Sequence, residues 1–197
     1  MTGIIDYGAG NLRSVQKALE YLGEPDVISD SESVLDGCDR LILPGVGAFG
    51  QGMEALNAKK LPEYIRRRAK EVPVLGICLG MQFLMRRSFE DGEHAGLGFC
   101  DGDVIRFREG KVPSIGWNCV SALRSPLFSG IPEGSEFYFV HSYYAPVGEY
   151  TIARAEYGVS FSAAVWDGKN AYGVQFHPEK SGEKGLALLR NFVRLNG

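Results

Sequence analysis

The sequence places a cysteine between two glycines at the end of an apolar run. Val72–Ile77 is typical of a buried strand, and Gly76, Cys78 and Gly80 follow the pattern G-x-C-x-G before a helical stretch. Glycines at these positions would permit a tight, strained turn that lifts the side chain of Cys78 out of the sheet. The helix that follows would favour the thiolate, the reactive form of cysteine. The pattern therefore predicts a nucleophile, whereas a free cysteine without this setting is usually a small buried side chain.

A histidine and a glutamate stand two residues apart in the segment Gly173–Glu179. A thiolate nucleophile needs an imidazole to hold it as an ion pair and to protonate the leaving group, and a carboxylate fixes the tautomer of that imidazole. Pro178 favours an extended backbone at His177, and side chains two apart in an extended segment point to the same side. We therefore predict a catalytic triad of Cys78, His177 and Glu179.

A glycine-rich segment, Gly45–Gly50, follows the predicted strand Arg40–Leu43 and matches G-x-G-x-x-G. This pattern alone is a weak indication of a dinucleotide site. The sequence from Leu61 is helical where such a site would have a strand ending in an acid. A better interpretation is that the loop Pro44–Gly47 donates a backbone N–H to the oxyanion of an acyl transfer reaction, with the N–H of Leu79 as the other donor.

The order of predicted elements defines the fold class. In the first half, short apolar runs alternate with helical patterns, including 11–22 and 79–87, which predicts parallel strands with covering helices. The second half is richer in strands and closes with an amphipathic helix over 182–195. We predict one α/β domain, 1–197, with a central, mostly parallel sheet flanked by helices and antiparallel strands added in its C-terminal half. Strands are expected at 3–5, 26–28, 40–43, 72–77, 99–107, 117–121, 136–144, 151–156, 160–166 and 171–176.

Composition argues against several other classes of protein. The 197 residues include 21 basic and 24 acidic side chains, so no basic surface is expected to attract nucleic acid or anionic lipid. The N-terminus lacks a basic segment and no apolar stretch approaches the ~20 residues of a spanning helix, so we expect neither a signal peptide nor a membrane protein. The four cysteines lie far apart, which fits a reducing cytoplasm, and with the three histidines they lack zinc-site spacing. We expect no metal and no cofactor.

Two motifs, G-I-C-L-G-M-Q around Cys78 and V-Q-F-H-P-E ending at Glu179, are specific when they occur together. On these motifs the chain resembles the class I, triad-type glutamine amidotransferases, which implies a flavodoxin-like α/β fold. Within that family it is similar to the glutaminase subunits of imidazole glycerol phosphate synthases. Further segments carry this similarity: 6–12, 43–49, 116–118, 137–143 and 177–181.

The resemblance implies a reaction and a partner. Glutamine would be hydrolysed here to glutamate and ammonia, and ammonia would pass to a cyclase subunit with a (β/α)8 barrel. That subunit would make imidazole glycerol phosphate and aminoimidazole carboxamide ribotide in histidine biosynthesis. By matching position, the residues implied to hold glutamine are Gln82, Ser142 and Tyr143. Those implied to donate to the oxyanion are Leu79 with Val46 or Gly47. Those implied to face the cyclase near the ammonia exit are Asn11, Tyr138 and Lys180.

Three alternatives remain open. The chain could be the glutaminase of another synthase, such as the pyridoxal phosphate or anthranilate system, although its segments 6–11 and 44–47 argue against this. It could be a non-catalytic binding subunit on the same scaffold, but such a subunit would be expected to lose part of the triad. It could also be a cysteine peptidase or esterase on a related scaffold, which Gln82 and the His-Pro-Glu sequence disfavour.

Overall fold

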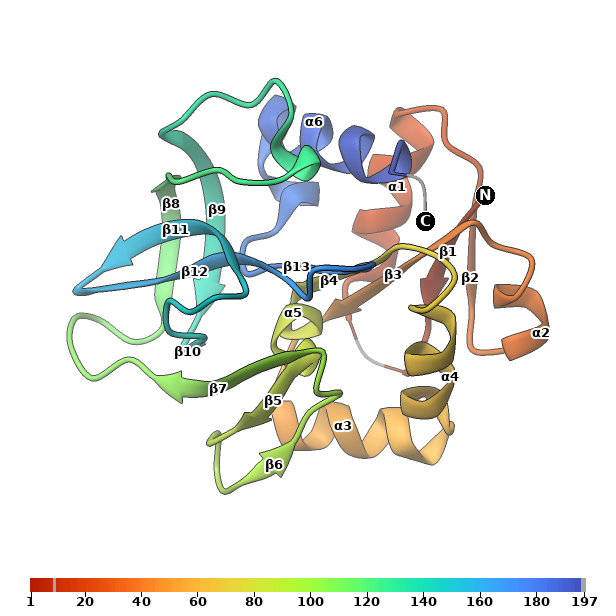
Figure 1. The fold of residues 1–197 in the computed structure, drawn as a ribbon, viewed down its shortest axis with the longest axis horizontal. Helices are drawn as coiled ribbons and strands as arrows, with labels where there is room; N and C mark the ends of the chain where they lie inside the picture. The colour runs from red at the N-terminus through yellow and green to blue at the C-terminus, as the bar shows by residue number, and fades with distance from the viewer. Residues whose placement is uncertain (9, 196–197) are drawn as a thin grey trace.

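A seven-stranded sheet runs through the middle of the molecule in the computed structural model, which describes residues 1–8 and 10–195 (Figure 1). The strand order is β11-β12-β13-β4-β3-β1-β2, and the five strands from β13 to β2 are parallel. Strand β12 is antiparallel to β13, and β11 is antiparallel to β12. The predicted mostly parallel sheet is therefore confirmed. Its strands are β1 (Thr2–Ile5), β2 (Asp26–Ser29), β3 (Arg40–Gly45), β4 (Val74–Cys78), β11 (Thr151–Tyr157), β12 (Val159–Trp166) and β13 (Ala171–Val174).

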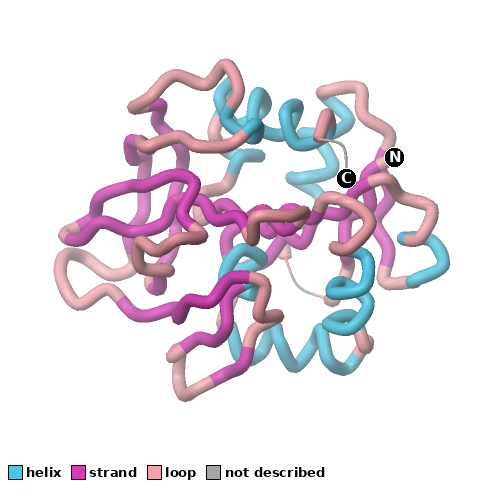
Figure 2. Tube along the Cα trace, viewed as in Figure 1, coloured by secondary structure: helices cyan, strands magenta, loops and turns pink. Residues whose placement is uncertain are grey.

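Helices cover both faces of this sheet, as Figures 1 and 2 show. Helices α1 (Leu12–Tyr21) and α6 (Gly182–Val193) lie on one face. Helices α3 (Phe49–Ala58), α4 (Leu61–Arg68) and α5 (Leu79–Leu84) lie on the other face, and α2 (Glu32–Leu35) is near the β2 edge. None of the helices in the described part of the chain is long and apolar enough to cross a membrane.

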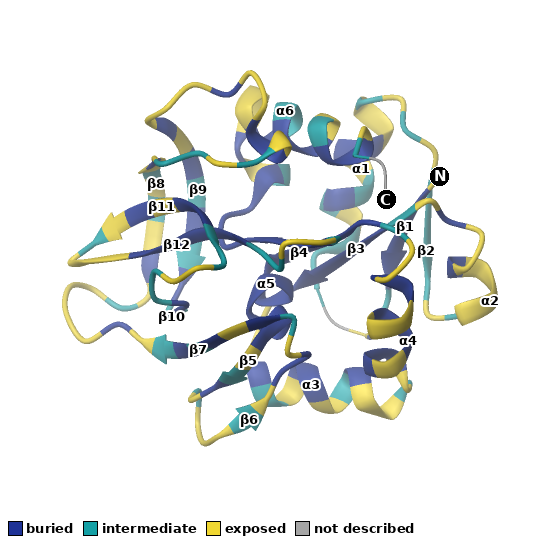
Figure 3. Ribbon diagram, viewed as in Figure 1, coloured by how far each residue is buried: buried dark blue, intermediate teal, exposed yellow. Residues whose placement is uncertain are grey.

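The central strands are apolar along their whole length because both of their faces are buried (Figure 3). Side chains alternate between the two faces. Ile42 and Leu75 pack in the core cluster that includes α1 and α6, whereas Leu41 and Val74 pack in the cluster that includes α3 and α4. Continuous apolar runs in the sequence therefore mark the strands that are covered on both sides.

Two smaller sheets extend from the central one. A four-stranded sheet has the order β10-β7-β5-β6, and a separate antiparallel pair joins β8 to β9. A short 3-10 helix, η2 (Pro178–Lys180), precedes α6, and another, η1 (Pro126–Phe128), packs beside it. The strands of the smaller sheets are β5 (Met85–Ser88), β6 (His94–Ala95), β7 (Cys100–Arg106), β8 (Ser114–Val120), β9 (Ser135–His141) and β10 (Tyr143–Tyr144).

The structure corrects one predicted helix. The segment 79–87 was expected to be helical throughout, but α5 ends at Leu84, and Met85–Ser88 forms strand β5 in parallel pairing with β7. The backbone N–H groups of Leu97 and Phe99 donate to the carbonyls of Phe83 and Leu84, so tertiary partners take up the last carbonyls of the helix. A short apolar run has no feature in its sequence that separates these two outcomes.

The helix ends also differ in detail from the prediction. Helix α1 spans Leu12–Tyr21 within the predicted range 11–22, and the side-chain oxygen of Asn11, just before it, accepts the hydroxyl of Ser14. The last helix ends at Val193, two residues earlier than predicted.

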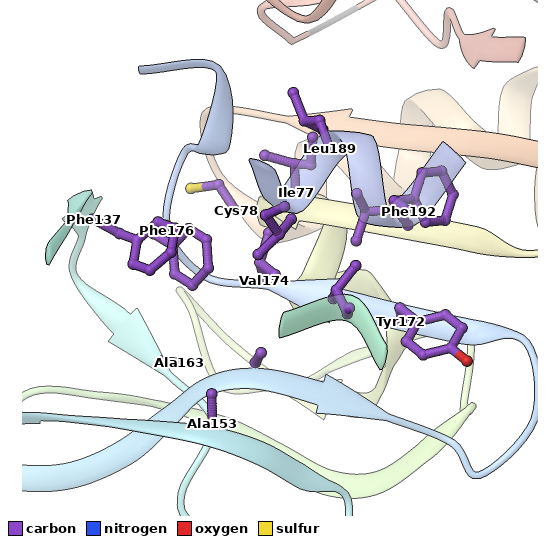
Figure 4. Packing of buried hydrophobic residues seen from close by; sticks show 14 of the residues in the cluster. Ile77, Cys78, Phe137, Ala153, Ala163, Tyr172, Val174, Phe176, Leu189 and Phe192 are labelled. Carbon is purple, nitrogen blue, oxygen red and sulfur yellow. The ribbon is translucent and has the colours of Figure 1, made fainter. Parts of the chain in front are cut away.

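The central sheet brings three chain segments together at one edge. The carboxyl ends of β3, β4 and β13 lie side by side, with Gly45 paired to Cys78 and Gly173 to Gly76. Figure 4 shows Cys78 at this edge of the core, near the stacked rings of Phe137 and Phe176, whose centroids are 4.1 Å apart. Ligands of open parallel sheets bind at the carboxyl ends of the strands, so this edge is the place to search for a site.

Candidate active site

Cys78 stands at the junction between β4 and α5. Its backbone has φ +55° and ψ −110°, a conformation that residues other than glycine rarely adopt. The flanking glycines leave room for this turn. A Cβ at Gly80 would lie 1.8 Å from the carbonyl oxygen of Leu43, and one at Gly76 would lie 2.4 Å from the carbonyl oxygen of Gly80. The spacing G-x-C-x-G thus corresponds to a close approach of backbones around a strained cysteine.

We expect Gly80→Ala to lower the free energy of unfolding by about 3 kcal/mol, because the added Cβ would meet the backbone of β3 and not a movable side chain. Gly23→Ala is the matched control. Gly23 has φ +74° and open space around its Cβ position, so only backbone strain of about 1 kcal/mol is expected there. Urea unfolding measures both values, and equal losses would contradict the role of the close approach.

His177 and Glu179 lie against each other at the end of β13. The distance from His177 Nδ1 to Glu179 Oε1 is 2.8 Å, and their side chains are only 2% and 1% exposed. The sequence suggested that this contact would run along an extended segment, but it does not. It spans the start of the 3-10 helix η2, with only His177 itself extended. The hydroxyl of Ser181 donates to the His177 carbonyl and accepts the N–H of Tyr138, which ties this corner to β9.

The charge of His177 follows from its two neighbours. Burial lowers the pKa of His177, but interactions with the sulfur of Cys78 and with the carboxylate of Glu179 outweigh burial and raise that pKa to about 9. At neutral pH the imidazole is therefore protonated. Its Nε2 has no hydrogen-bond partner among the described residues, which leaves this proton available on the side away from Glu179.

A cavity of about 310 Å³ opens above Cys78 and His177. This volume suits a small amino acid. Among the described residues, Glu90 supplies the only carboxylate of the lining. Burial raises the pKa of that carboxyl above its usual range, although the N–H of Phe49 donates to it at 2.6 Å and opposes the rise. The lining residues are Val46, Gly47, Cys78, Leu79, Gln82, Glu90, Pro113, Val140, His141, Ser142, Tyr143 and His177.

Nine residues predicted to act in catalysis or substrate binding can be located. The structure brings eight of them into the lining of this cavity, and the ninth, Glu179, contacts His177 from behind. Val46 and Gly47 are exposed at the end of β3, and Gly47 has φ +97°. Gln82 is buried, and its Nε2 donates to the carbonyl of Tyr143 and to Gln175 Oε1, both at 3.1 Å. Because both amide hydrogens are used inside the protein, only the Gln82 carbonyl oxygen remains to face a ligand.

Four further residues of the cavity were not predicted from the sequence: Glu90, Pro113, Val140 and His141. Glu90 follows β5 in a polar turn without any motif. His141 is buried at the end of β9 and also lines the cavity. Its Nδ1 lies 2.8 Å from the Tyr143 carbonyl, and burial lowers its pKa to about 4, so the ring is neutral with its proton on Nδ1. Only their position in the structure shows that these residues line the cavity.

The three residues predicted to face a partner are all accessible. Asn11 and Tyr138 are half-buried, and Lys180 is exposed. Tyr138 packs edge-on against Trp117, which is 53% exposed on the neighbouring strand β8. Ile115, on the same face of β8, is 60% exposed. The sequence analysis did not single out this exposed apolar face of β8, which adjoins the strand that lines the cavity.

Residues 3–195 match the family described as glutamine amidotransferase class-I. The fold, the cysteine at the strand-to-helix turn and this match agree, and the chain belongs to the class-I glutamine amidotransferase family, a family of enzymes. The predicted family is confirmed.

Its curated relatives share nearly their whole length with it. A protein named imidazole glycerol phosphate synthase subunit HisH 1, from Methanococcus maripaludis, is 47% identical over 204 residues, covering 99% of this chain and 100% of the relative. The subunit HisH of Moorella thermoacetica is 49% identical over 197 residues, covering 98% of this chain and 93% of the relative.

Solved structures share the fold at lower identity. A crystal structure of a glutamine amidotransferase superimposes with a TM-score of 0.77 at 22% identity, covering 98% of this chain and 96% of that one. The structure of PurLQS from Thermotoga maritima gives a TM-score of 0.75, also at 22% identity and with the same coverage. Chains that differ this much in sequence therefore adopt the same α/β architecture.

Proposed function

We propose that this chain hydrolyses the side-chain amide of L-glutamine to glutamate and ammonia. One observation carries the proposal: a strained cysteine and a buried, carboxylate-bound histidine meet at a cavity of about 310 Å³. Cysteine, an imidazole and an orienting carboxylate form the arrangement that acyl transfer through a thioester requires. The 197 residues act as a single domain in the cytoplasm, without metal or cofactor.

The proposed reaction has two stages. In the first, the Cys78 thiolate attacks the amide carbon and a carbon–sulfur bond forms. The carbon–nitrogen bond then breaks as His177 Nε2 protonates the departing nitrogen, which leaves as ammonia. In the second, neutral His177 takes a proton from water, the hydroxide attacks the thioester, and glutamate leaves as the thiolate is restored. Glu179 holds the Nδ1 proton of His177 throughout, so Nε2 always faces the reaction.

Backbone N–H groups stabilise the negative oxygen that forms in both stages. Leu79, the first residue of α5, supplies one donor beside Cys78, and the loop at Val46 and Gly47 supplies the other. Val46 and Gly47 are exposed at the end of β3, and Gly47 has the backbone freedom to change its orientation. We infer that a bound partner sets this loop, which would keep free glutaminase activity low.

Recognition of glutamine uses the remaining walls of the cavity. The Glu90 carboxylate provides the negative charge that an α-ammonium group requires, and its position on a polar turn keeps it accessible. The Gln82 carbonyl oxygen and the segment Ser142–Tyr143 hold the rest of the substrate. Binding at both ends of the substrate places its amide at Cys78.

The ammonia is passed to a cyclase subunit with a (β/α)8 barrel, with which the chain forms a heterodimer. Relatives of about half-identical sequence carry the name imidazole glycerol phosphate synthase subunit, which supports this partner. The products would be imidazole glycerol phosphate and aminoimidazole carboxamide ribotide, in histidine biosynthesis. The docking surface is the exposed face of β8 with Ile115 and Trp117, extended by Asn11, Tyr138 and Lys180.

Glutamate release from glutamine tests the proposal. The purified chain should release glutamate slowly alone and much faster with the cyclase and its ribonucleotide substrate. Stimulated activity supports both the reaction and the partner. Activity that ignores the cyclase would keep the reaction but point to another synthase, such as the pyridoxal phosphate or anthranilate system. No activity under any condition would favour a binding subunit without catalysis.

Trp117→Ala is expected to weaken binding to the cyclase by about thirtyfold, or about 2 kcal/mol, because an exposed tryptophan on an apolar face is a frequent centre of interface energy. Tyr21→Ala is the control, since Tyr21 is 77% exposed on α1 and outside the proposed surface. Titration calorimetry with the purified cyclase measures both affinities. Equal affinities for wild type and Trp117→Ala would show that the cyclase binds to a different surface.

A further inference from the structure

We propose that Gln175, held in one orientation by Gln82, is a positioning residue that presents an N–H donor to the sulfur of Cys78 and so favours the thiolate. The proposal deepens the proposed function and rests on it for the role of Cys78 as nucleophile. It assigns to the glutamine of V-Q-F-H-P-E a task at the thiolate, and it gives Gln82 a task besides the predicted contact with substrate.

The orientation of Gln82 is determined by a backbone carbonyl. The carbonyl oxygen of Tyr143 only accepts hydrogen bonds, and Gln82 Nε2 lies 3.1 Å from it. The opposite placement of the Gln82 amide would set two acceptor oxygens against each other. The same carbonyl also lies 2.8 Å from His141 Nδ1, whose proton it accepts, so two buried side chains converge on it.

The orientation of Gln175 follows from that of Gln82. The second hydrogen on Gln82 Nε2 points to Gln175 Oε1, which is 3.1 Å away. Because that oxygen faces Gln82, the Gln175 amide nitrogen must face the other way, and it lies 3.8 Å from Cys78 Sγ. Gln82 therefore donates both to the Tyr143 carbonyl and to Gln175 Oε1, and Gln175 in turn donates to the sulfur of Cys78.

Burial strengthens the effect of these hydrogen bonds on the sulfur of Cys78. Gln175 is fully buried and Gln82 is 4% exposed, so water does not compete for their amide N–H groups. A donor in a dry environment stabilises a negative sulfur more than a neutral one. The carbonyl of Val140, also 3.8 Å from Sγ, has the opposite preference because it accepts only from the protonated thiol. The Gln175 donor therefore opposes the effect of the Val140 carbonyl on the thiolate.

Alkylation of Cys78 by iodoacetamide tests the proposal without any substrate. The rate is measured from pH 5 to 10 by mass spectrometry of the Cys78 peptide, and the half-maximal pH reports thiolate formation. Gln175→Met keeps the volume but removes the donor, and we expect the half-maximal pH to rise by about one unit. Gln175→Glu places an acceptor beside the sulfur, and we expect a larger rise.

Two internal controls accompany the measurement. Cys119, an exposed cysteine in the same samples, should keep its half-maximal pH in every variant. Gln51→Glu changes an exposed glutamine in the same way on α3 and should leave Cys78 unchanged. In glutamine hydrolysis, the Gln175 variants should lower kcat more than they change KM, since the donor acts on the nucleophile and not on the substrate.

An unchanged half-maximal pH in folded Gln175→Met and Gln175→Glu would overturn the proposal, as would a rise in the methionine variant that exceeds that of the glutamate variant. Thermal melting establishes folding. Where both Gln175 variants fail to fold, Gln82→Met decides, because it removes the group that orients Gln175, and an unchanged value there overturns the proposal too. The Gln175 variants could show the expected rise in half-maximal pH while wild type has no glutaminase activity. The proposed function would then fail, but the assignment of Gln175 would stand.

Discussion

Cys78→Ala is expected to lower glutamine hydrolysis by at least about four orders of magnitude, with or without the cyclase, because no thioester can form. The affinity for glutamine should change little, since the groups that hold its two ends remain in place. Alanine takes up less space at the same strained backbone position, so the fold should survive. Glutamate release under saturating glutamine and calorimetric binding of glutamine to the variant measure the two effects separately.

Cys119→Ala is the matched control for Cys78→Ala. Cys119 is exposed on β8 and takes no part in the cavity, so the isolated subunit should keep its wild-type rate. Activity of Cys78→Ala within tenfold of wild type would place the nucleophile elsewhere and remove the basis of the proposed mechanism. The hydrolysis would then have to proceed by direct attack of water.

Glu179→Gln is expected to lower kcat by about a thousandfold or more, since loss of an orienting carboxylate in a triad has effects of this order. The amide can donate to Nδ1, which would place the histidine proton on the wrong nitrogen. The change keeps the size of the side chain, and the glutamine KM should stay within a few fold. Steady-state kinetics at neutral pH measures both constants.

The pH dependence gives this prediction a sign. The folded pKa of His177 is raised to about 9, so the imidazolium is present below that pH and is lost above it. Wild-type activity should therefore fall on the alkaline side near pH 9. Removing the Glu179 carboxylate removes one of the two groups that raise the pKa of His177, so the alkaline fall should begin at lower pH in Glu179→Gln.

Glu183→Gln controls for the loss of one negative charge. Glu183 is an exposed glutamate in the first turn of α6, only four residues from Glu179. This variant should keep the wild-type rate and the wild-type alkaline limb. A Glu179→Gln profile that fell at the same pH as wild type would show that Glu179 does not control the protonation of His177.

Local sequence patterns were sufficient to predict the elements that depend on neighbouring residues. Continuous apolar runs predicted the buried parallel strands, and the glycines around Cys78 predicted the turn that the structure shows. Glycine carries this information because no other residue tolerates a backbone oxygen 1.8 Å from its Cβ position. The spacing of His177 and Glu179, two residues apart, also predicted that their side chains would lie close together. They meet across a 3-10 turn, however, and not along an extended segment.

The convergence of distant residues could not be predicted from the sequence, because it depends on contacts made in the folded protein. The helix predicted through residue 87 was wrong for Met85–Ser88, which forms a strand because it pairs with β7. Glu90, just after this strand, lies in the wall of the cavity, although its local sequence contains no motif that predicts this position. Gln175 was recorded as part of a motif, but its orientation depends on Gln82, 93 positions earlier, and on the Tyr143 carbonyl. Hydrogen-bond direction and burial are properties of side chains that folding brings together, and a linear sequence contains neither.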